Sequence, residues 1–98
     1  MILEQAVLHV RPGSEDEFIA AFEQARSIIA SMPGFIDLDL SRCLEDESVF
    51  LLLVQWEALE DHTEGFRRSP EYQQWRRLLH HFYDPFPEVL HFAGVASA

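Results

Sequence analysis

The sequence predicts an α+β protein, in which a ferredoxin-like four-stranded antiparallel sheet carries its helices on one face. The apolar spacing changes between strand-like and helix-like in the order strand, helix, strand, strand, broken helix, strand. Two of the strands are apolar on both faces, and short Pro-Gly or acidic turns join the elements. With 98 residues and no linker-like composition, the chain is expected to form one domain over residues 1–98.

The first predicted strand, residues 2–10, has apolar residues at both odd and even positions, which is typical of a strand covered on both sides. Gln5 and His9 share one face with Leu3 and Val7. Two interpretations of this polar pair are open. The two side chains lie at a strand margin with satisfied hydrogen bonds, or they look into a cavity under the helices.

The first helix is predicted to begin after the Pro12-Gly13 turn and to run for about 18 residues. Ser14 and Glu17 have the spacing of a capping box. Pro33-Gly34 ends the segment. The apolar residues recur with helical spacing on a single stripe, namely Phe18, Phe22, Ala25, Ile29 and Met32.

The two middle strands are expected to form an antiparallel hairpin across a short acidic turn. Residues 35–43 alternate between apolar and polar, so Asp37 and Asp39 fall on one face. Such a carboxylate pair can serve acid–base or metal chemistry, but more often it only solvates a strand. Residues 49–57 are apolar on both faces, as in a central strand.

The segment from residue 58 to residue 83 is predicted to be a helix that breaks once. Leu59, either His62 or Thr63, and Phe66 form a short helical stripe over residues 58–67. Ser69-Pro70 has the pattern of an N-cap followed by proline at the first helical position. The second part places an apolar stripe at Tyr72, Trp75, Leu79 and Phe82. Residues 88–95 are predicted to form the last strand.

This element order puts both helices on the same face of the sheet and leaves an apolar face bare. A second copy of the sheet is the simplest cover, so we expect a homodimer with the two sheets packed face to face. The formal net charge of -10 disfavours nucleic acid and anionic membrane partners.

Further patterns bear on location. Cys43 is the single cysteine, so no intrachain disulfide is expected. The N-terminal segment lacks the pattern of a signal peptide, and no apolar run is long enough for a membrane span. The expectation is a soluble cytoplasmic protein.

Several motifs together resemble the antibiotic biosynthesis monooxygenase domain family over about residues 2–95. They are the Pro-Gly turn with its acidic helix start, Met-Pro-Gly-Phe before the second strand, Val-Gln-Trp-Glu at the end of the third, and a Leu-x-x-His…Ser-Pro-x-Tyr pattern, at Leu59, His62, Ser69, Pro70 and Tyr72. The resemblance implies a dimeric α/β barrel with a pocket between sheet and helices in each protomer. Members of that family include cofactor-independent oxygenases of aromatic phenols and haem-degrading monooxygenases, and other members have no assigned activity. The resemblance therefore implies one of these two reactions or a protein without a known one.

Haem degradation is disfavoured because the three residues used by that branch of the family are not kept. Gln5 stands at the position of its asparagine, Gly65 or Phe66 at that of its tryptophan, and Trp75 or Arg76 at that of its haem-ligating histidine. Adjacent His80 and His81 point about 100° apart on a helix and cannot chelate one metal as an i, i+4 pair would.

A cofactor-independent oxygenase needs a base, donors for the developing oxyanion and a dry apolar pocket, but no cofactor. His62 is the candidate base, since imidazole titrates near neutrality. The candidate residues for binding a small aromatic substrate are Gln5, His9, Phe66, Tyr72 and Trp75. Structural alternatives stay open: His62 bonds a backbone carbonyl, and Tyr72 and Trp75 belong to the core.

Two classes of function therefore remain, a small cofactor-independent monooxygenase and a non-catalytic dimeric module that binds a small ligand or fills its own pocket. An open cavity that His62 lines would favour the enzyme. A space filled by aromatic side chains would favour the module. Arg67, Arg68, Arg76 and Arg77 form the one basic cluster, which either attracts an anionic substrate or solvates a helix face.

Overall fold

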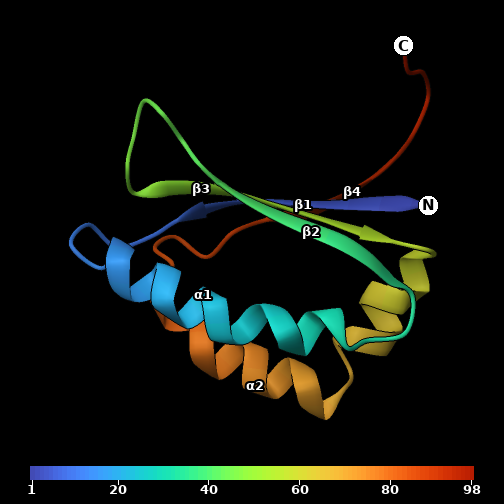
Figure 1. The fold of residues 1–98 in the computed structure, drawn as a ribbon, viewed down its shortest axis with the longest axis horizontal. Coiled ribbons are helices and arrows are strands. Elements are labelled where there is room, and N and C mark those ends of the chain that lie inside the picture. The colour runs from blue at the N-terminus through green and yellow to red at the C-terminus, as the bar shows by residue number, and fades with distance from the viewer.

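The computed structural model describes residues 1–98 and shows a four-stranded antiparallel sheet with all helices on one face (Figure 1). The strands are β1 (Ile2–His9), β2 (Phe35–Arg42), β3 (Val49–Trp56) and β4 (Val89–Ala93), in the spatial order β2-β3-β1-β4. This is the predicted ferredoxin-like arrangement. The first three strands each end one residue earlier than predicted, and the last is shorter than the expected residues 88–95.

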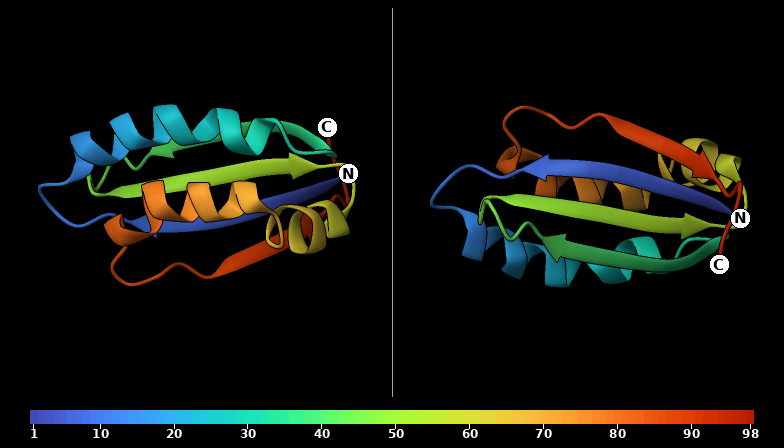
Figure 2. Two further views of the ribbon diagram at one scale, coloured as in Figure 1. Left: turned by 90° about the horizontal axis from the view of Figure 1, so that it is seen from below. Right: turned by 90° about the horizontal axis from the view of Figure 1, so that it is seen from above.

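The helices cover the sheet in two rows (Figure 2). One row is α1 (Glu15–Ala30), and the other is formed by the π-helical segment η1 (Asp61–Phe66), α2 (Pro70–Leu79) and the 3₁₀ turn η2 (His80–Phe82). The predicted break at Ser69 is confirmed. Ser69 Oγ accepts a hydrogen bond from the Tyr72 amide at 3.1 Å, which satisfies one of the free N–H groups at the start of α2. No helix is long and apolar enough to cross a membrane.

The apolar stripe of α1 is confirmed, but its predicted capping box is not. Phe18, Phe22, Ala25 and Ile29 are all buried. The Ser14 side chain makes no capping hydrogen bond. Glu15 instead holds the start of the helix, because its carboxylate accepts from the Gly13 amide at 2.9 Å and from the Ser48 hydroxyl. The acidic first turn therefore anchors the β2–β3 hairpin rather than closing on itself.

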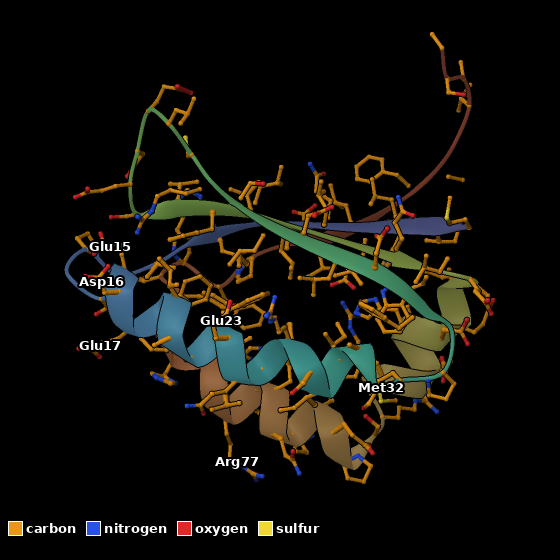
Figure 3. All side chains as sticks on the ribbon, in the orientation of Figure 1. Glu15, Asp16, Glu17, Glu23, Met32 and Arg77 are labelled. Atoms are coloured by element: carbon orange, nitrogen blue, oxygen red, sulfur yellow. The ribbon has the colours of Figure 1, made fainter.

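The two faces of the sheet differ in what covers them (Figure 3). On the helix side, every second residue of β3 is buried, from Phe50 to Trp56. On the other side, Val7, Leu90 and Phe92 are each more than two-fifths exposed. The predicted bare apolar face is therefore present in the single chain.

The alternation along β1 corrects one expectation about the site. Glu4, Ala6 and Leu8 are the buried residues, so the helix-facing positions are the even ones. Gln5 and His9 lie on the opposite face, and the interpretation that they look into a cavity under the helices is wrong. Asp37 and Asp39 on β2 are exposed, in keeping with a solvated strand face.

Candidate active site

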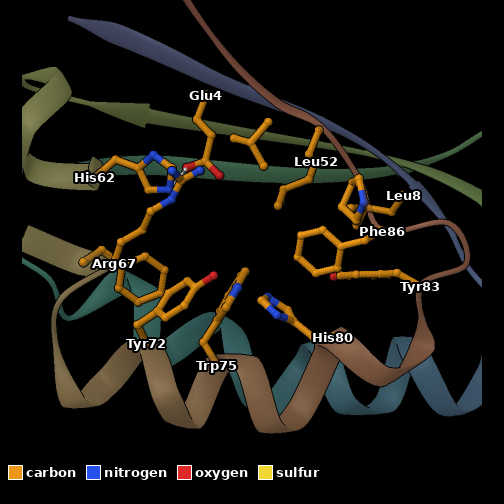
Figure 4. Close-up of a pocket in the computed structure, with 14 residues that line it drawn as sticks. Glu4, Leu8, Leu52, His62, Arg67, Tyr72, Trp75, His80, Tyr83 and Phe86 are labelled. Carbon is orange, nitrogen blue, oxygen red and sulfur yellow. Dashed lines mark ion pairs between the residues drawn. The ribbon is translucent and has the colours of Figure 1, made fainter. Parts of the chain in front are cut away.

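A cavity of about 360 Å³ lies between the sheet and the α2 side of the helical layer (Figure 4). This volume falls in the range of small-molecule sites. Aromatic side chains from the helical side and from the segment before β4 line much of it, namely Phe66, Tyr72, Trp75, His80, Tyr83 and Phe86. Phe18 and Phe22 do not enter it, so the space is not filled in the way expected of a non-catalytic module.

Glu4 supplies a carboxyl group to the sheet wall of this cavity. It is 5% exposed because it occupies a helix-facing position of the central strand β1. Trp56 Nε1 donates a hydrogen bond to Glu4 Oε1 at 2.9 Å, and Oε2 makes no hydrogen bond within the protein. Burial raises the pKa of Glu4 because it penalises the charged form, while the Trp56 donor and the Arg67 guanidinium oppose that rise.

His62 reaches Glu4 from η1. Its side chain is buried, its ring stacks on Trp56 with the centroids 5.6 Å apart, and its Nε2 lies 3.4 Å from Glu4 Oε1. Burial, helped by the positive charge of Arg67 and by His91, lowers the pKa of His62 to about 3. The imidazole is therefore neutral near pH 7, so its 3.4 Å contact with Glu4 is a polar contact rather than an ion pair between two charges.

His91 lies on the far side of His62. Its Nε2 is 2.8 Å from His62 Nδ1, and its Cα pairs with that of Glu4 across the β1–β4 ladder. The ring is partly exposed, and burial lowers its pKa, with a smaller contribution from Arg67. Four side chains thus form one chain of polar contacts, Trp56–Glu4–His62–His91.

Arg67 follows η1 and lines the same end of the cavity. It makes no ion pair within the protein, whereas its neighbour Arg68 binds Glu64 at 3.0 Å on the outer surface. The basic cluster is therefore divided: Arg68 belongs to a solvated helix face, and Arg67 presents a free guanidinium to the cavity.

The structure brings together four of the six site residues that the sequence suggested. His62, Phe66, Tyr72 and Trp75 all line the cavity. The alternative that His62 bonds a backbone carbonyl is wrong, because its ring contacts Glu4 and His91. Trp75 and Phe66 also belong to the hydrophobic core, so the core interpretation of Trp75 is confirmed and a substrate-binding role stays a prediction.

Sequence reasoning missed Glu4, His91 and the particular position of Arg67. A signal for Glu4 was present, because it shares the even parity of Ala6 and Leu8 in β1. A charged residue on the buried face of a central strand is rare without a partner. For His91 no comparable signal existed, since only the pairing of β1 with β4 places it beside Glu4.

Fold and site together define a class: a ferredoxin-like α+β protein with a ligand-sized cavity that holds a buried carboxyl–imidazole pair. The family model of antibiotic biosynthesis monooxygenases matches residues 1–78. The chain therefore belongs to the antibiotic biosynthesis monooxygenase family.

Similar proteins agree with this assignment. The uncharacterized protein YczJ of Bacillus subtilis (strain 168) is 57% identical over 95 residues, which cover 97% of this chain and all of YczJ. A crystal structure from Bordetella bronchiseptica that bears the family's name is 34% identical, with a TM-score of 0.91 and 97% of each chain covered. SnoaB from Streptomyces nogalater, described as a cofactor-independent oxygenase, shares the fold with a TM-score of 0.86 at 17% identity, covering 98% of this chain and 94% of SnoaB.

Proposed function

We propose that this protein is a small cofactor-independent monooxygenase that acts on an aromatic, quinol-like compound inside the cavity. The observation that carries the proposal is the Glu4–His62 pair, held at the wall of an aromatic-lined space. Membership of the family supports a monooxygenase. The printed activity of SnoaB, a structural relative, supports chemistry without a cofactor.

Within this proposal, Glu4 takes the role of base that the sequence suggested for His62. A base must be ionised before it reacts and must have a pKa near working pH. Burial moves the pKa of Glu4 toward that range, whereas it moves the pKa of His62 away from it. Glu4 Oε2 is free to accept a proton, while Oε1 is occupied by Trp56 and His62.

The remaining lining residues divide the other tasks. The free guanidinium of Arg67 stabilises the oxyanion that develops when the substrate loses its proton. Tyr72, Trp75 and Phe66 form apolar walls against which a planar ring stacks. These walls also shield the buried Glu4 carboxyl group from bulk water, which strengthens its electrostatic effect.

The reaction balances without an external reductant. Glu4 removes a proton from an activated CH₂ group of the substrate, and the resulting anion transfers electrons to dioxygen. A carbon-bound hydroperoxide forms. Loss of the second C–H proton and cleavage of the O–O bond then give a ketone carbon and one water molecule. In total, R₂CH₂ and O₂ become R₂C=O and H₂O.

The same proposal includes a homodimer formed by the bare sheet face. Val7, Leu90 and Phe92 expose apolar surface over the two neighbouring strands β1 and β4, and contiguous apolar surface of this kind often marks an interface. The cavity lies on the other side of the sheet, so each protomer has its own site. We expect no nucleic acid partner, because the net charge is -10.

Oxygen uptake against a panel of anthrones and quinols tests the function. The wild-type protein should consume oxygen with at least one of these compounds in the absence of added metal, flavin or haem. Glu4→Gln should remove that uptake, and Arg68→Gln, on the outer surface, should keep it. Ligand binding without oxygen uptake would favour the non-catalytic module. A Soret shift on adding hemin would favour haem degradation instead.

A further inference from the structure

The contact between His62 and His91 constrains where the protons lie. A neutral imidazole has one N–H donor and one acceptor nitrogen. A distance of 2.8 Å between His62 Nδ1 and His91 Nε2 requires one proton between the two nitrogens. That proton belongs either to His91 or to His62, and the choice fixes which tautomer His62 adopts.

Each choice has a different consequence for Glu4. If His91 donates, His62 Nδ1 is the acceptor and His62 carries its proton on Nε2, 3.4 Å from Glu4 Oε1, which suits an ionised carboxylate. If His62 donates to His91, its bare Nε2 faces Glu4, and the contact is favourable only when Glu4 is protonated. The proton order of the two histidines is therefore linked to the charge of Glu4 across a total of two contacts, 2.8 and 3.4 Å long.

We propose that His91 is a positioning residue for this site: by donating to His62 Nδ1 it holds His62 in the Nε2–H tautomer, which keeps Glu4 ionised. Its effect on turnover rests on the proposed function, in which Glu4 is the base. Its effect on the His62 tautomer does not.

The position of His91 suits this role. It is placed opposite Glu4 by the β1–β4 register, it contacts His62, and it is not among the residues that line the cavity. Its Nδ1 makes no hydrogen bond within the protein, so the outer end of the chain of contacts is open. The charged or titratable groups that act on this chain of contacts are Arg67 and its three titratable members, Glu4, His62 and His91.

The same geometry describes how the buried carboxyl exchanges protons. The two proton orders differ by one proton on the chain as a whole. Going from the ionised to the protonated state, His91 Nδ1 gains a proton, the Nε2 proton of His91 passes to His62 Nδ1, and the Nε2 proton of His62 passes to Glu4 Oε1. Every transferred proton leaves one nitrogen and joins its hydrogen-bond partner, so no charged imidazole remains in either state.

Two variants of His91 separate a positioning role from simple packing. His91→Phe keeps a ring but removes the donor. His91→Gln keeps an N–H donor at similar reach, because the amide nitrogen of glutamine approximates Nε2 of histidine. His81→Phe serves as the control, since His81 is exposed on η2 and outside the cavity.

The test is NMR of the ring nitrogens and of the Glu4 carboxyl carbon, recorded without substrate. The wild-type protein above the pKa of Glu4 should show His62 protonated at Nε2 and bare at Nδ1. In His91→Phe, His62 should become a mixture of tautomers, and the pKa of Glu4 should rise by about one unit, since the N–H group 3.4 Å from the carboxylate is no longer held there. His91→Gln and His81→Phe should keep the wild-type values.

In oxygen uptake, His91→Phe should lower kcat about tenfold below the raised pKa of Glu4 and leave KM within about twofold. An unchanged His62 tautomer and an unchanged Glu4 pKa in a folded His91→Phe protein would overturn the proposal. If the tautomers shift as expected but no protein consumes oxygen, the positioning role stands and the proposed function fails. If His91→Phe does not fold, a wild-type spectrum with His62 protonated at Nδ1 above the pKa of Glu4 overturns the proposal by itself.

Discussion

The two ends of the cavity differ in the side chains that line them. At one end, Glu4 and His62 bring a carboxyl group and an imidazole together in a buried wall, and the exposed Arg67 adds a free guanidinium. At the other end, His80, Tyr83 and Phe86 pack ring against ring with no charged group among them. In the proposed account the first end performs proton transfer and the second end holds the substrate. Changes at the two ends should therefore affect different kinetic constants.

The largest effect is expected at the polar end, from Glu4→Gln. The substitution keeps the shape of the side chain and removes the group that accepts the proton. A general base typically contributes about 10²–10⁴-fold to the rate. We expect kcat to fall by at least about 100-fold with KM changed little. Steady-state oxygen uptake measures both constants. A loss confined to KM would place Glu4 in substrate binding instead.

The Glu4→Gln variant, which should lower activity, should raise the stability of the folded protein at high pH. The folded-state pKa of Glu4 is raised, so the unfolded chain releases its proton at lower pH, and the wild type loses stability as pH rises above about 4.5. Glu4→Gln has no such loss. Its midpoint of thermal unfolding should exceed that of the wild type near pH 8, and the difference should shrink toward pH 4.

For His62 we expect the reverse pH dependence of stability, with a loss as pH falls. Its pKa is lowered to about 3 in the folded protein, so unfolding takes up a proton between about pH 6.5 and that value. The wild type should lose up to about 1.4 kcal/mol of unfolding free energy per pH unit through this group as pH falls. His62→Phe should flatten this part of the profile in urea titrations at several pH values. An equal slope in both proteins would contradict the neutral, buried imidazole.

The aromatic end should respond in KM. Phe86 lines the cavity but is 61% exposed, so Phe86→Ala removes a binding surface with little loss of packing. We expect KM to rise about tenfold, since roughly 1.4 kcal/mol of apolar contact corresponds to that factor, with kcat within about threefold. Phe92→Ala removes the same side chain on the bare face, away from the cavity, and is the control for a general loss of an aromatic ring.

The smallest kinetic effect should come from the bare face itself. Phe92→Glu places a charge where we expect two sheets to pack, so it should shift the protein from dimer to monomer in sedimentation velocity. Both ends of the cavity come from one chain, so kcat/KM per protomer should change less than about threefold. A large loss of activity in the monomer would show that the partner contributes to the site.

Sequence patterning predicted the fold better than the site, for a physical reason. Periodicity records which face of an element is buried, so the stripe of Phe18 to Ile29 and the two-sided strands follow from the sequence. The same parity argument misplaced Gln5 and His9, because a strand that is apolar on both faces does not reveal which face the helices cover. The Glu4–His62–His91 contacts depend on strand register and on the π-helical turn, and neither is a local property of the sequence.

The central claim is that Glu4 is the base, and the pH dependence of kcat/KM tests it most directly. The acid limb of the wild-type profile should fall at the pKa of Glu4 read from its carboxyl ¹³C shift, above the usual value of 4.5. Glu4→Gln should lack that limb in whatever activity remains. An acid limb at a pH unrelated to the Glu4 titration, or one that survives in Glu4→Gln, would contradict the account.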